Sequence, residues 1–595
     1  MRLRDHRLRL MLAVSACAFL VVIGRAVQVQ VLDAASLAAR AVQQQQTVLT
    51  VPGLRGTIYS SDGQVLAEEM PAVSIVANQR LVQHPAQEAK VIAGDLGYKL
   101  VKVPKVKKKK PSKAQLKFIR SQKRKRAAFK REVQSLTAAL TGTSTFAYVA
   151  RQLDPPVART ILAHHLPGLS GVSEDRRAYP NGGLAAQLIG FTDIDSSGVN
   201  GSGLEHMLNP YLRAREGKRV IVRDPSGTAL ETVQLSAPGN GRNVRLTIDS
   251  SVEAYVQQVL GHTVRATGAR SATAIVMNPH TGAILAMASA PSYDNNRVHD
   301  LSPSRLRYTQ NLATDMAYEP GSVFKAVTYS AALSEGLIYP GMEFKNLPYS
   351  IHVADKVIHD DAPRPPEDFT ARKCLAVSSN VCADTIASWV HSGPLLQWIY
   401  KFGFGRYPTL RFPGDTPGIV PPLGRWSGSS IGTIPIGQGI SVTPLQIADM
   451  YAAIANGGVM PEPHVLQHIQ GVHLPRPRGR RVLRPDVDAT LVSMLKNVVD
   501  WQSGTGVAAR IPGYSVAGKT GTAQMANGHG GYAKGQYMAS FVGFFPASAP
   551  RVLIMVAVER PRTSIFGGTV AAPAFEQIGA WYAKHAGIPP DQPQH

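Results

Sequence analysis

A serine and a lysine stand three residues apart in the stretch AYEPGSVFKAVTYSAAL, residues 317–333. Ser322 and Lys325 would face the same side of a helix that begins there, which brings the amine within reach of the hydroxyl. A serine hydroxyl is a poor nucleophile at neutral pH, and a lysine can serve as its base when burial or nearby positive charge lowers the lysine pKa. The pair therefore predicts nucleophilic catalysis by Ser322, with Lys325 as the general base.

A second polar motif lies in LAVSSNVCADTIA, where Ser378 follows Ser322 by 56 residues and is followed by Ser379 and Asn380. In a catalytic site these side chains would relay protons and bind polar substrate groups. Taken alone, Ser378 and Asn380 could equally cap the N-terminus of a helix. A lone S-x-x-K spacing also arises by chance in a chain of this size.

A third motif, Lys519-Thr520-Gly521-Thr522, follows YSVAG, which can form a strand. Lys519 would supply positive charge, and the hydroxyls of Thr520 and Thr522 would suit a carboxylate. Gly521 is expected to leave the strand face open, so that a substrate backbone can approach. The three motifs together favour catalysis over helix capping.

The elements that must position these motifs follow from length and composition. The chain has 595 residues, of which 44% are hydrophobic, so it can form several domains and a large core. Strand-like pieces with turn signals fill residues 33–92, as in RGTIYSSDGQVLA (residues 55–67). From residue 243 to about residue 585 the pattern is mixed α/β, so one large C-terminal domain should hold all three motifs.

The N-terminus places an apolar run after four arginines, at positions 2, 4, 7 and 9. Residues 10–24 are short for a bilayer span of ~20 residues, but continuation to residue 32 suffices if Arg25 reaches the interface. The basic flank predicts a cytoplasmic tail (1–9), a span (10–32) and later residues outside. A cleaved signal peptide has a similar pattern, and VSAC, which ends at Cys17, resembles a lipoprotein cleavage box.

Basic residues concentrate between positions 99 and 131, which hold 16 Lys or Arg and no acidic residue, two-thirds of the net charge of +24. The insertion around them, residues 93–150, is interpreted as a solvated or partly disordered segment, or else as a contact for an anionic lipid or polymer. Nucleic-acid binding is not expected, because the anchor places this segment outside the cell. Some apolar residues of the insertion are spaced loosely as one helical face: Leu116, Ile119, Phe129, Val133, Leu136 and Leu140.

The three cysteines, Cys17, Cys374 and Cys382, have neither metal-ligand spacing nor the pattern of a disulfide framework. No metal and no other cofactor is expected. Cys374 and Cys382 could pair, but we expect two unpaired, buried thiols.

The S-x-x-K, S-x-N and K-T-G motifs occur together, in this order, in β-lactamases and penicillin-binding proteins. The chain resembles the class B penicillin-binding proteins, which are monofunctional peptidoglycan D,D-transpeptidases, and most closely their FtsI-like, cell-division branch. The resemblance covers nearly the whole chain except the basic insertion. It rests on stretches that include RGTIYSSDG, RRAYPNGGLAAQLIGFTD, GSGLE, AYEPGSVFK, IPIGQGISVTPLQIADMYAAIANGG, KTGTAQ, GGYAKGQYMASFVGFFPASAPRVLIMVAVERP and FGGTVAAPAFEQI.

The resemblance implies an acyl-transfer cycle. Ser322 would attack the carbonyl between two terminal D-alanines of a stem peptide, and Lys325 would take the serine proton. Ser378 would relay a proton to the leaving nitrogen with Lys519 nearby, and Asn380 would bind the donor amide. An amine of a neighbouring stem peptide would then close the cross-link, and β-lactams would acylate the same serine.

The substrate-binding residues implied by the resemblance are Thr520, Gly521 and Thr522. Thr520 and Thr522 would hold the terminal carboxylate of the donor. The backbone N–H groups of Ser322 and Thr522 would form the oxyanion hole.

The fold implied is multidomain α/β and α+β. A single transmembrane helix would precede an elongated, mainly β pedestal (33–242), a penicillin-binding/β-lactamase-like transpeptidase domain (243–585) with an antiparallel sheet flanked by helices, and a loose tail (586–595). The implied partners are peptidoglycan stem peptides, the lipid-linked precursor, β-lactams, the membrane, and a SEDS-type glycosyltransferase with divisome proteins. Three pedestal residues are interpreted as structural ion-pair residues: Arg55, Arg177 and Glu205.

Other functions remain open at this level. An elongation- or sporulation-type class B transpeptidase would carry the same motifs. A β-lactamase would need neither an anchor nor residues 33–240, and a β-lactam sensor would have several spans where hydropathy indicates one. A scaffold with a dead site would be expected to lose Ser322 or Lys325. The acceptor amine is not determined by the sequence.

Overall fold

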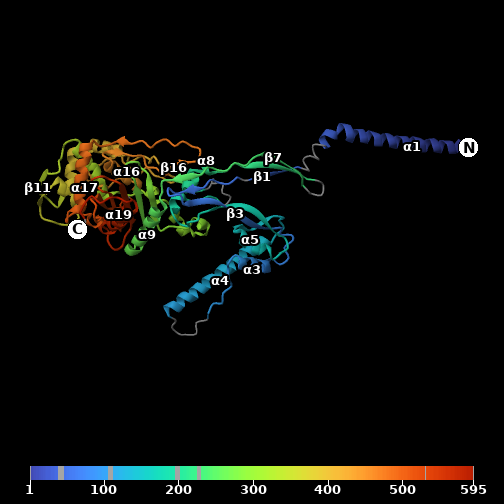
Figure 1. Cartoon of the computed structure of the whole chain (residues 1–595), viewed down its shortest axis with the longest axis horizontal. Coiled ribbons are helices and arrows are strands. Elements are labelled where there is room, and N and C mark those ends of the chain that lie inside the picture. Colours follow the sequence, from blue (N-terminus) through green and yellow to red (C-terminus); the bar gives the residue numbers. More distant parts are fainter. Residues whose placement is uncertain are drawn as a thin grey trace. The chain divides into compact units, whose positions relative to one another are not determined.

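The computed structural model describes residues 2–37, 46–51, 53–104, 112–193, 201–223, 229–529 and 531–593. The chain divides into two compact units, which are described separately (Figure 1). One unit comprises Met1–Arg55 and Arg213–Gly241, and the other comprises Gly56–Leu212 and Arg242–His595.

The first unit contains an apolar helix and a small sheet. Helix α1 (Arg2–Val27) continues into the π-helical turn η1 (Gln28–Leu32). Within the described part of the chain, one segment is long and apolar enough to cross a membrane, Leu8–Leu32, with a mean hydropathy of 2.3. The sheet is antiparallel in the order β1 (Gln46–Val51), β6 (Gly217–Arg223) and β7 (Ala229–Ser236).

A six-stranded sheet in the second unit joins segments far apart in sequence. The strands are β2 (Ile58–Tyr59), β3 (Val65–Ala77), β4 (Ala147–Leu153), β5 (Leu169–Ala178), β8 (Val244–Leu246) and β16 (Leu466–Ile469). The strand–turn–strand predicted for residues 55–67 is confirmed by the β2–β3 pairing. Because β2 also pairs with β8, the domain boundary predicted at 242/243 falls within this sheet.

Three helices cover part of this sheet: α3 (Pro85–Asp95), α4 (Lys113–Leu140) and α5 (Pro155–Leu162). Leu136 and Leu140 of α4 are buried, and Phe129 and Val133 pack beside them, which confirms the predicted apolar face for this end of the helix. Leu116 is exposed, so at the other end the predicted face does not pack.

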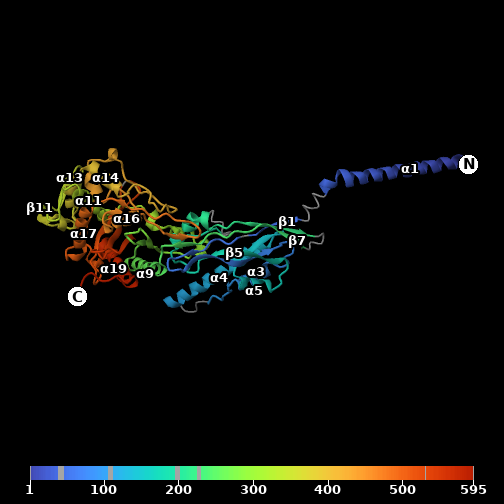
Figure 2. The ribbon, with the colours of Figure 1, turned by 45° about the horizontal axis from the view of Figure 1, so that its top comes forward.

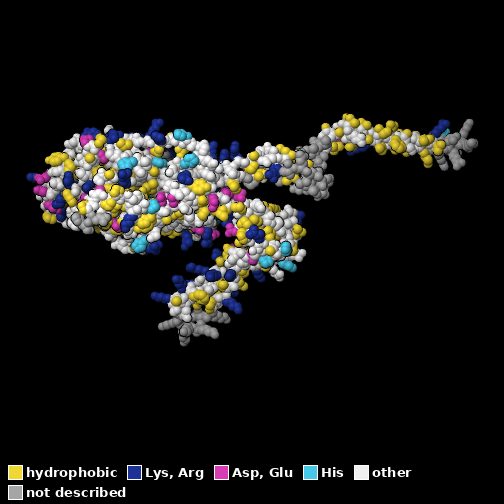
Figure 3. Space-filling view, viewed as in Figure 1, with side chains coloured by type: hydrophobic (Ala, Val, Ile, Leu, Met, Phe, Trp, Pro, Cys, Tyr) yellow, Lys and Arg dark blue, Asp and Glu magenta, His cyan; other side chains and the backbone are white. Residues whose placement is uncertain are grey.

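The basic residues of α4 are all exposed, and they are visible as dark blue side chains along that helix (Figure 3). From residue 113 onward the basic segment is helical. The helix begins with a capping box, in which the side chains of Ser112 and Gln115 each accept from the other's backbone N–H. Residues 105–111 of the segment lie outside the described residues.

The central sheet of the second unit is antiparallel in the order β10 (Ile284–Ala290), β9 (Ser271–Met277), β20 (Val552–Glu559), β19 (Tyr532–Phe545) and β18 (Ala517–Ala526). Alternate residues of these strands belong to two different hydrophobic clusters. Since side chains alternate between the two faces of a strand, both faces of the sheet are buried. This explains why β9, β10 and β20 are almost continuously apolar, and the sheet confirms the predicted antiparallel sheet flanked by helices.

Helices α9 (Ser250–Thr267) and α19 (Ala572–His585) cover one face of this sheet and lie next to each other in Figure 2. Helices α11 (Lys325–Ser334), α13 (Asn380–Val390), α16 (Pro444–Ala455) and α17 (Pro485–Asp500) belong to the core on the other face. The active-site motifs come from this second layer of helices and from β18.

The remaining elements are short. The helices are α6 (Ala186–Ile189), α7 (Gly203–Met207), α8 (Asn209–Leu212), α10 (Leu312–Asp315), α12 (Ala371–Ala376), α14 (Ser392–Lys401), α15 (Ser430–Thr433) and α18 (Gly567–Val570). The strands are β11 (Glu343–Leu347), β12 (Ser350–Val353), β13 (Lys356–His359), β14 (Glu367–Thr370), β15 (Val459–Met460) and β17 (Arg480–Arg481).

Two further predictions can be compared with this fold. Arg177 Nε donates to Glu205 Oε1 at 2.6 Å, and both side chains are buried, so the predicted structural ion pair is confirmed. Arg55 is also buried. The C-terminal tail is not loose as predicted, because Ile588 is buried and Ser515 N donates to the Asp591 carboxylate at 2.7 Å.

Candidate active site

Ser322 lies in a 3₁₀ turn, η4 (Gly321–Phe324), which leads directly into α11. Side chains at i and i+3 eclipse in a 3₁₀ helix, so this turn stacks Ser322 over Lys325. Gly321 has φ +60°, and a Cβ at that position would lie 2.8 Å from the carbonyl oxygen of Thr522. Only glycine combines this backbone conformation with such a close approach to β18.

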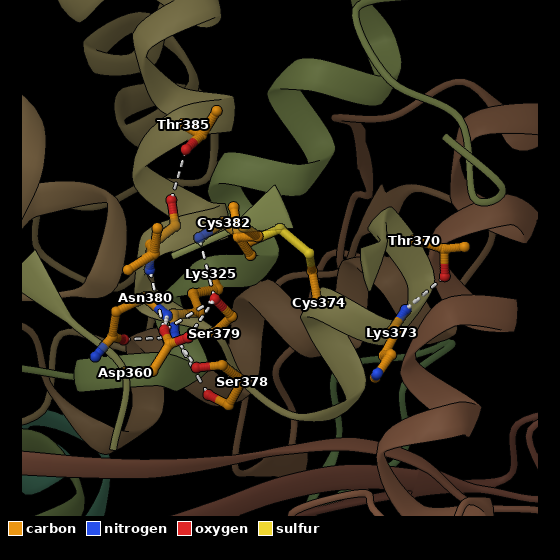
Figure 4. Close-up of a disulfide and its surroundings, with 12 residues drawn as sticks. Lys325, Asp360, Thr370, Lys373, Cys374, Ser378, Ser379, Asn380, Cys382 and Thr385 are labelled. Carbon is orange, nitrogen blue, oxygen red and sulfur yellow. Dashed lines mark hydrogen bonds between the residues drawn. A yellow bond between two sulfur atoms is a disulfide. The ribbon is translucent and has the colours of Figure 1, made fainter. Parts of the chain in front are cut away.

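The amine of Lys325 is fully buried and its three hydrogen bonds run to the second motif (Figure 4). Nζ donates to Ser378 O at 2.5 Å, to Asn380 Oδ1 at 2.7 Å and to Ser378 Oγ at 3.2 Å. These three acceptors match the three donors of an ammonium group. Within the described residues, the hydrogen bond predicted between Lys325 and Ser322 is not formed, because these acceptors occupy the amine.

Burial lowers the pKa of Lys325 to about 8, and the charges of Asp361, Asp360 and Asp384 oppose that shift. Asp384 lies one turn beyond Asn380 in α13, and neither oxygen of its buried carboxyl has a hydrogen-bond partner among the described residues. Burial raises the pKa of Asp384 to about 8, so this carboxyl is largely protonated at neutral pH. Asp384 therefore carries little negative charge at neutral pH, and burial remains the largest effect on the pKa of Lys325.

The second motif forms the turn between α12 and α13, and Ser378 adopts the left-handed region with φ +63°. Ser379 is the N-cap of α13, where its Oγ accepts from Cys382 N at 3.1 Å. The helix-capping role that was considered for Ser378 and Asn380 therefore belongs to Ser379. This division of roles leaves the side chains of Ser378 and Asn380 for the amine of Lys325.

Asp360 fixes this turn from a separate segment. Its Oδ1 accepts from Asn380 N at 2.7 Å and from Ser379 Oγ at 2.9 Å, and its Oδ2 accepts from Arg364 Nη2 at 2.9 Å (Figure 4). A carboxylate at the N-terminus of α13 is also favoured by the helix dipole. No motif in the sequence identified Asp360, because it lies about 20 residues before the turn that it holds.

A disulfide joins Cys374 of α12 to Cys382 of α13, with the Cα atoms 6.0 Å apart (Figure 4). The prediction of two unpaired thiols is therefore wrong, although both cysteines are buried as expected. The physical reason is the tight turn between α12 and α13, which places two residues separated by eight positions side by side. The bridge encloses the turn that carries Ser378 and Asn380.

The third motif lies on β18, an edge strand of the central sheet. Lys519 is fully buried, and its Nζ donates to Thr520 Oγ1 at 3.2 Å. Burial holds the pKa of Lys519 well below its ordinary value, and the nearby charge of Lys325 adds to this effect. Thr520, which is buried, and Thr522, which is half-buried, are two residues apart on the strand and both line a cleft.

The glycine of this motif is required by packing. A Cβ on Gly521 would overlap the hydroxyl of Ser540 and approach Val323 to 3.0 Å. Close packing against β19 and η4 therefore excludes a side chain at this position. The predicted approach of a substrate backbone to Gly521 stays a prediction.

The backbone of Thr522 is turned toward the nucleophile. Its carbonyl oxygen lies against Gly321 in η4, on the free edge of the sheet. In a strand, the N–H and C=O of one residue point to the same side. The N–H of Thr522 therefore also leaves the free edge beside Ser322, where an oxyanion could form.

The cleft has a volume of about 830 Å³ and unites the three motifs. Ser322, Ser378, Asn380, Thr520 and Thr522 line it, and Lys325 and Lys519 lie buried beneath its surface. Sequence reasoning missed several other lining residues, including the hydroxyls of Thr505 and Thr569, the apolar pair Ile565 and Phe566, and Asp361. A serine nucleophile above a lysine of lowered pKa can perform acyl transfer.

The chain is similar to known proteins over most of its length. Residues 272–580 match the penicillin binding protein transpeptidase domain, and residues 50–246 match the penicillin-binding protein dimerisation domain. The chain is 32% identical to penicillin-binding protein PbpB of Mycolicibacterium smegmatis over 94% of this chain and 87% of that protein. It is 34% identical to the peptidoglycan D,D-transpeptidase FtsI of Escherichia coli over 75% of this chain and 73% of that protein. The crystal structure of penicillin binding protein 3 from Mycobacterium tuberculosis, complexed with aztreonam, is similar to this chain with a TM-score of 0.66 and 26% sequence identity. The match covers 92% of this chain and 99% of that chain.

The first prediction concerns pH. Because burial lowers the pKa of Lys325 to about 8, the amine is charged below this pH and can accept the Ser322 proton only above it. The rate of Ser322 acylation should rise by about tenfold per pH unit below this pKa and level off above it. Rapid-quench kinetics at pH values on both sides of this pKa would measure the acylation rate. Lys325→Arg is the comparison variant, because its side chain stays charged and should be inactive at every pH. A flat profile would exclude Lys325 as the base.

The second prediction concerns the Cys374–Cys382 bridge, which closes a loop with a sequence separation of 8. Reduction should lower the free energy of unfolding by about 2.5 kcal/mol, as loop-closure entropy gives for so short a loop. Thermal unfolding of the detergent-solubilised chain, with and without a reductant, measures this effect. Cys17→Ser is the matched control, because it removes the free cysteine and keeps the bridge. An unchanged unfolding temperature after reduction would contradict the prediction.

Proposed function

The chain belongs to the class B penicillin-binding proteins and is FtsI-like, and from this membership we propose how its cleft performs the reaction. The protein is a serine-type peptidoglycan D,D-transpeptidase that cross-links stem peptides through a serine acyl-enzyme. The observation that carries this conclusion is the buried amine of Lys325, held by Ser378 and Asn380 beneath the cleft that Ser322 lines. β-Lactams react at the same site.

We propose that Ser322 attacks the carbonyl between the two terminal D-alanines and that Lys325 receives the serine proton. The contact of 3.2 Å between Lys325 Nζ and Ser378 Oγ supports a route for the return of this proton. The proton passes from Lys325 through Ser378 to the nitrogen of the departing D-alanine. The charge of Lys325 contributes to the lowered pKa of Lys519, so the two amines interact, and Lys519 supports the same transfer.

The donor peptide is positioned by the hydroxyls and amides around the serine. Thr520 and Thr522 hold its terminal carboxylate, and the N–H groups of Ser322 and Thr522 stabilise the oxyanion. Asn380 Oδ1 accepts from Lys325, and Nδ2 donates to His359 O at 2.8 Å. An amide nitrogen carries two donors, so the second N–H of Asn380 is left for the donor peptide.

The N-terminal helix anchors the protein in the membrane. We propose that the N-terminus is cytoplasmic and that the catalytic domain lies on the outer face, as the arginines before the apolar run indicate. A septal role is supported by the similarity to FtsI. The alternative within the class, a role in elongation, has the same cleft and the same chemistry.

The two matched family models, over residues 50–246 and 272–580, describe a dimerisation domain and a transpeptidase domain, and cross-linking needs glycan strands made by a polymerase. We therefore propose a SEDS-type glycosyltransferase of the divisome as partner, contacted through the anchor and the residues after it. Purification of the full chain from native membrane in mild detergent should recover such an enzyme with it. Recovery of the chain as a lone monomer would count against this partner.

The test of the catalytic assignment is covalent labelling. Fluorescent penicillin should label the full-length chain in detergent, and Ser322→Ala should abolish labelling because it removes the nucleophile. Lys325→Ala should lose nearly all labelling, because the serine then lacks its base. Ser304→Ala is the matched control, since Ser304 is exposed and lies outside the cleft, and it should label normally. Undiminished labelling of Ser322→Ala would refute the assignment of the nucleophile.

A further inference from the structure

The charges around the cleft are distributed unevenly. Asp361 is the one acidic residue among the described residues that line it, and it is the second residue after the end of β13. The hydroxyls of Thr520 and Thr522, above the buried Lys519, belong to β18. The cleft thus presents hydroxyls on one element, above a buried lysine, and a carboxylate on another.

Asp360 and Asp361 are neighbours in sequence with opposite surroundings. Asp360 is buried, and its carboxylate accepts from Ser379, Asn380 and Arg364. Asp361 is exposed, and among the described residues it makes no hydrogen bond or ion pair. The helix α13 therefore needs Asp360 and not Asp361, which leaves the charge of Asp361 available to a molecule in the cleft.

Asp361 is nevertheless close to the catalytic groups. Burial lowers the pKa of Lys325 and of Lys519, and in both cases the negative charge of Asp361 opposes that shift. The geometry agrees with this, because Asp361 and Ser322 line the same cleft and the adjacent Asp360 binds the turn that holds the Lys325 amine. A ligand bound to Asp361 would thus share the cleft with the acylated serine.

In the proposed reaction, the end of the donor peptide and the reacting group of the acceptor carry opposite charges. The donor ends in a carboxylate, which suits the threonine hydroxyls. The acceptor is a primary amine, which is an ammonium ion at neutral pH because the pKa of an alkylamine is about 10. Charge-assisted hydrogen bonds between an ammonium and a carboxylate are among the stronger polar contacts in proteins.

We propose that Asp361 binds the ammonium group of the acceptor and orients it toward the acyl group on Ser322, an inference that rests on the proposed function. The acceptor is then a cationic primary amine. Asp361 acts as a positioning residue and remains a carboxylate throughout the cycle.

The transfer step balances without a proton on Asp361. The bound ammonium first releases one proton to water at the exposed side of Asp361. The neutral amine attacks the ester carbonyl, so that a C–N bond forms and the bond from the carbonyl carbon to Ser322 Oγ breaks. The second amine proton passes through Ser378 and Lys325 to Ser322 Oγ, which restores the hydroxyl.

The test compares acceptors that differ in charge. Full-length chain in detergent is given a donor peptide that ends in D-Ala-D-Ala, with either D-alaninamide, an ammonium at neutral pH, or methoxyamine, which is uncharged. For Asp361→Asn we expect the KM for D-alaninamide to rise and the ratio of transfer to D-alaninamide over transfer to methoxyamine to fall by about tenfold, as loss of a charge-assisted contact predicts. Asp361→Glu should restore much of this ratio.

The matched control is Asp355→Asn. Asp355 lies between β12 and β13, is exposed, and does not line the cleft, so its substitution makes the same charge change on the same hairpin. It should leave the ratio unchanged. An equal fall in Asp355→Asn would show a general effect of net charge and would overturn the proposal.

The other outcomes are also decisive. A ratio that stays constant in Asp361→Asn overturns the proposal, because it means that Asp361 either is only solvated or acts through Lys325 on both acceptors alike. If the unmodified chain is not acylated by penicillin, the proposed function itself fails, and the inference fails with it. Penicillin acylation therefore separates the two failures.

Discussion

The hydrogen bonds of the Lys325 amine to Ser378 and Asn380 are the interaction on which the site depends. A lysine amine without contact with water is costly unless all its donors are satisfied or its pKa falls. Here both conditions hold, because three acceptors surround Nζ and burial brings its pKa to about 8. The same contacts join α11, which carries the lysine, to the turn before α13.

The turn before α13 is held from several sides, because Lys325 needs its acceptors in fixed positions. Ser379 caps the helix, Asp360 binds the backbone and side chains of the turn, and the Cys374–Cys382 bridge closes it. Ser378 can then keep its left-handed backbone, a conformation that a serine rarely adopts in a free loop. The conformation of this turn is thus fixed by these contacts, and not by the backbone preferences of its own residues.

The central sheet supplies the other half of the site. Both of its faces are buried, which fixes the register of β18 and decides which residues of the third motif face the cleft. Gly521 lets η4 and β19 approach the strand, and Gly321 lets the serine turn approach Thr522. The two glycines therefore set the distance between the nucleophile and the edge of the sheet.

The sequence by itself determined the family, through it the antiparallel sheet flanked by helices, and also the N-terminal apolar helix and the candidate catalytic residues, because these depend on residue type, period and the order of motifs along the chain. Only the tertiary structure decided the partners of those residues. The Lys325 amine donates to Ser378 and Asn380, Gly521 packs closely against β19 and η4, and the two cysteines of α12 and α13 are bonded. The roles of Asp360 and Asp361 also needed the fold. Spacing in sequence predicts contacts only within one helix or strand, whereas these contacts join separate elements whose approach is set by packing.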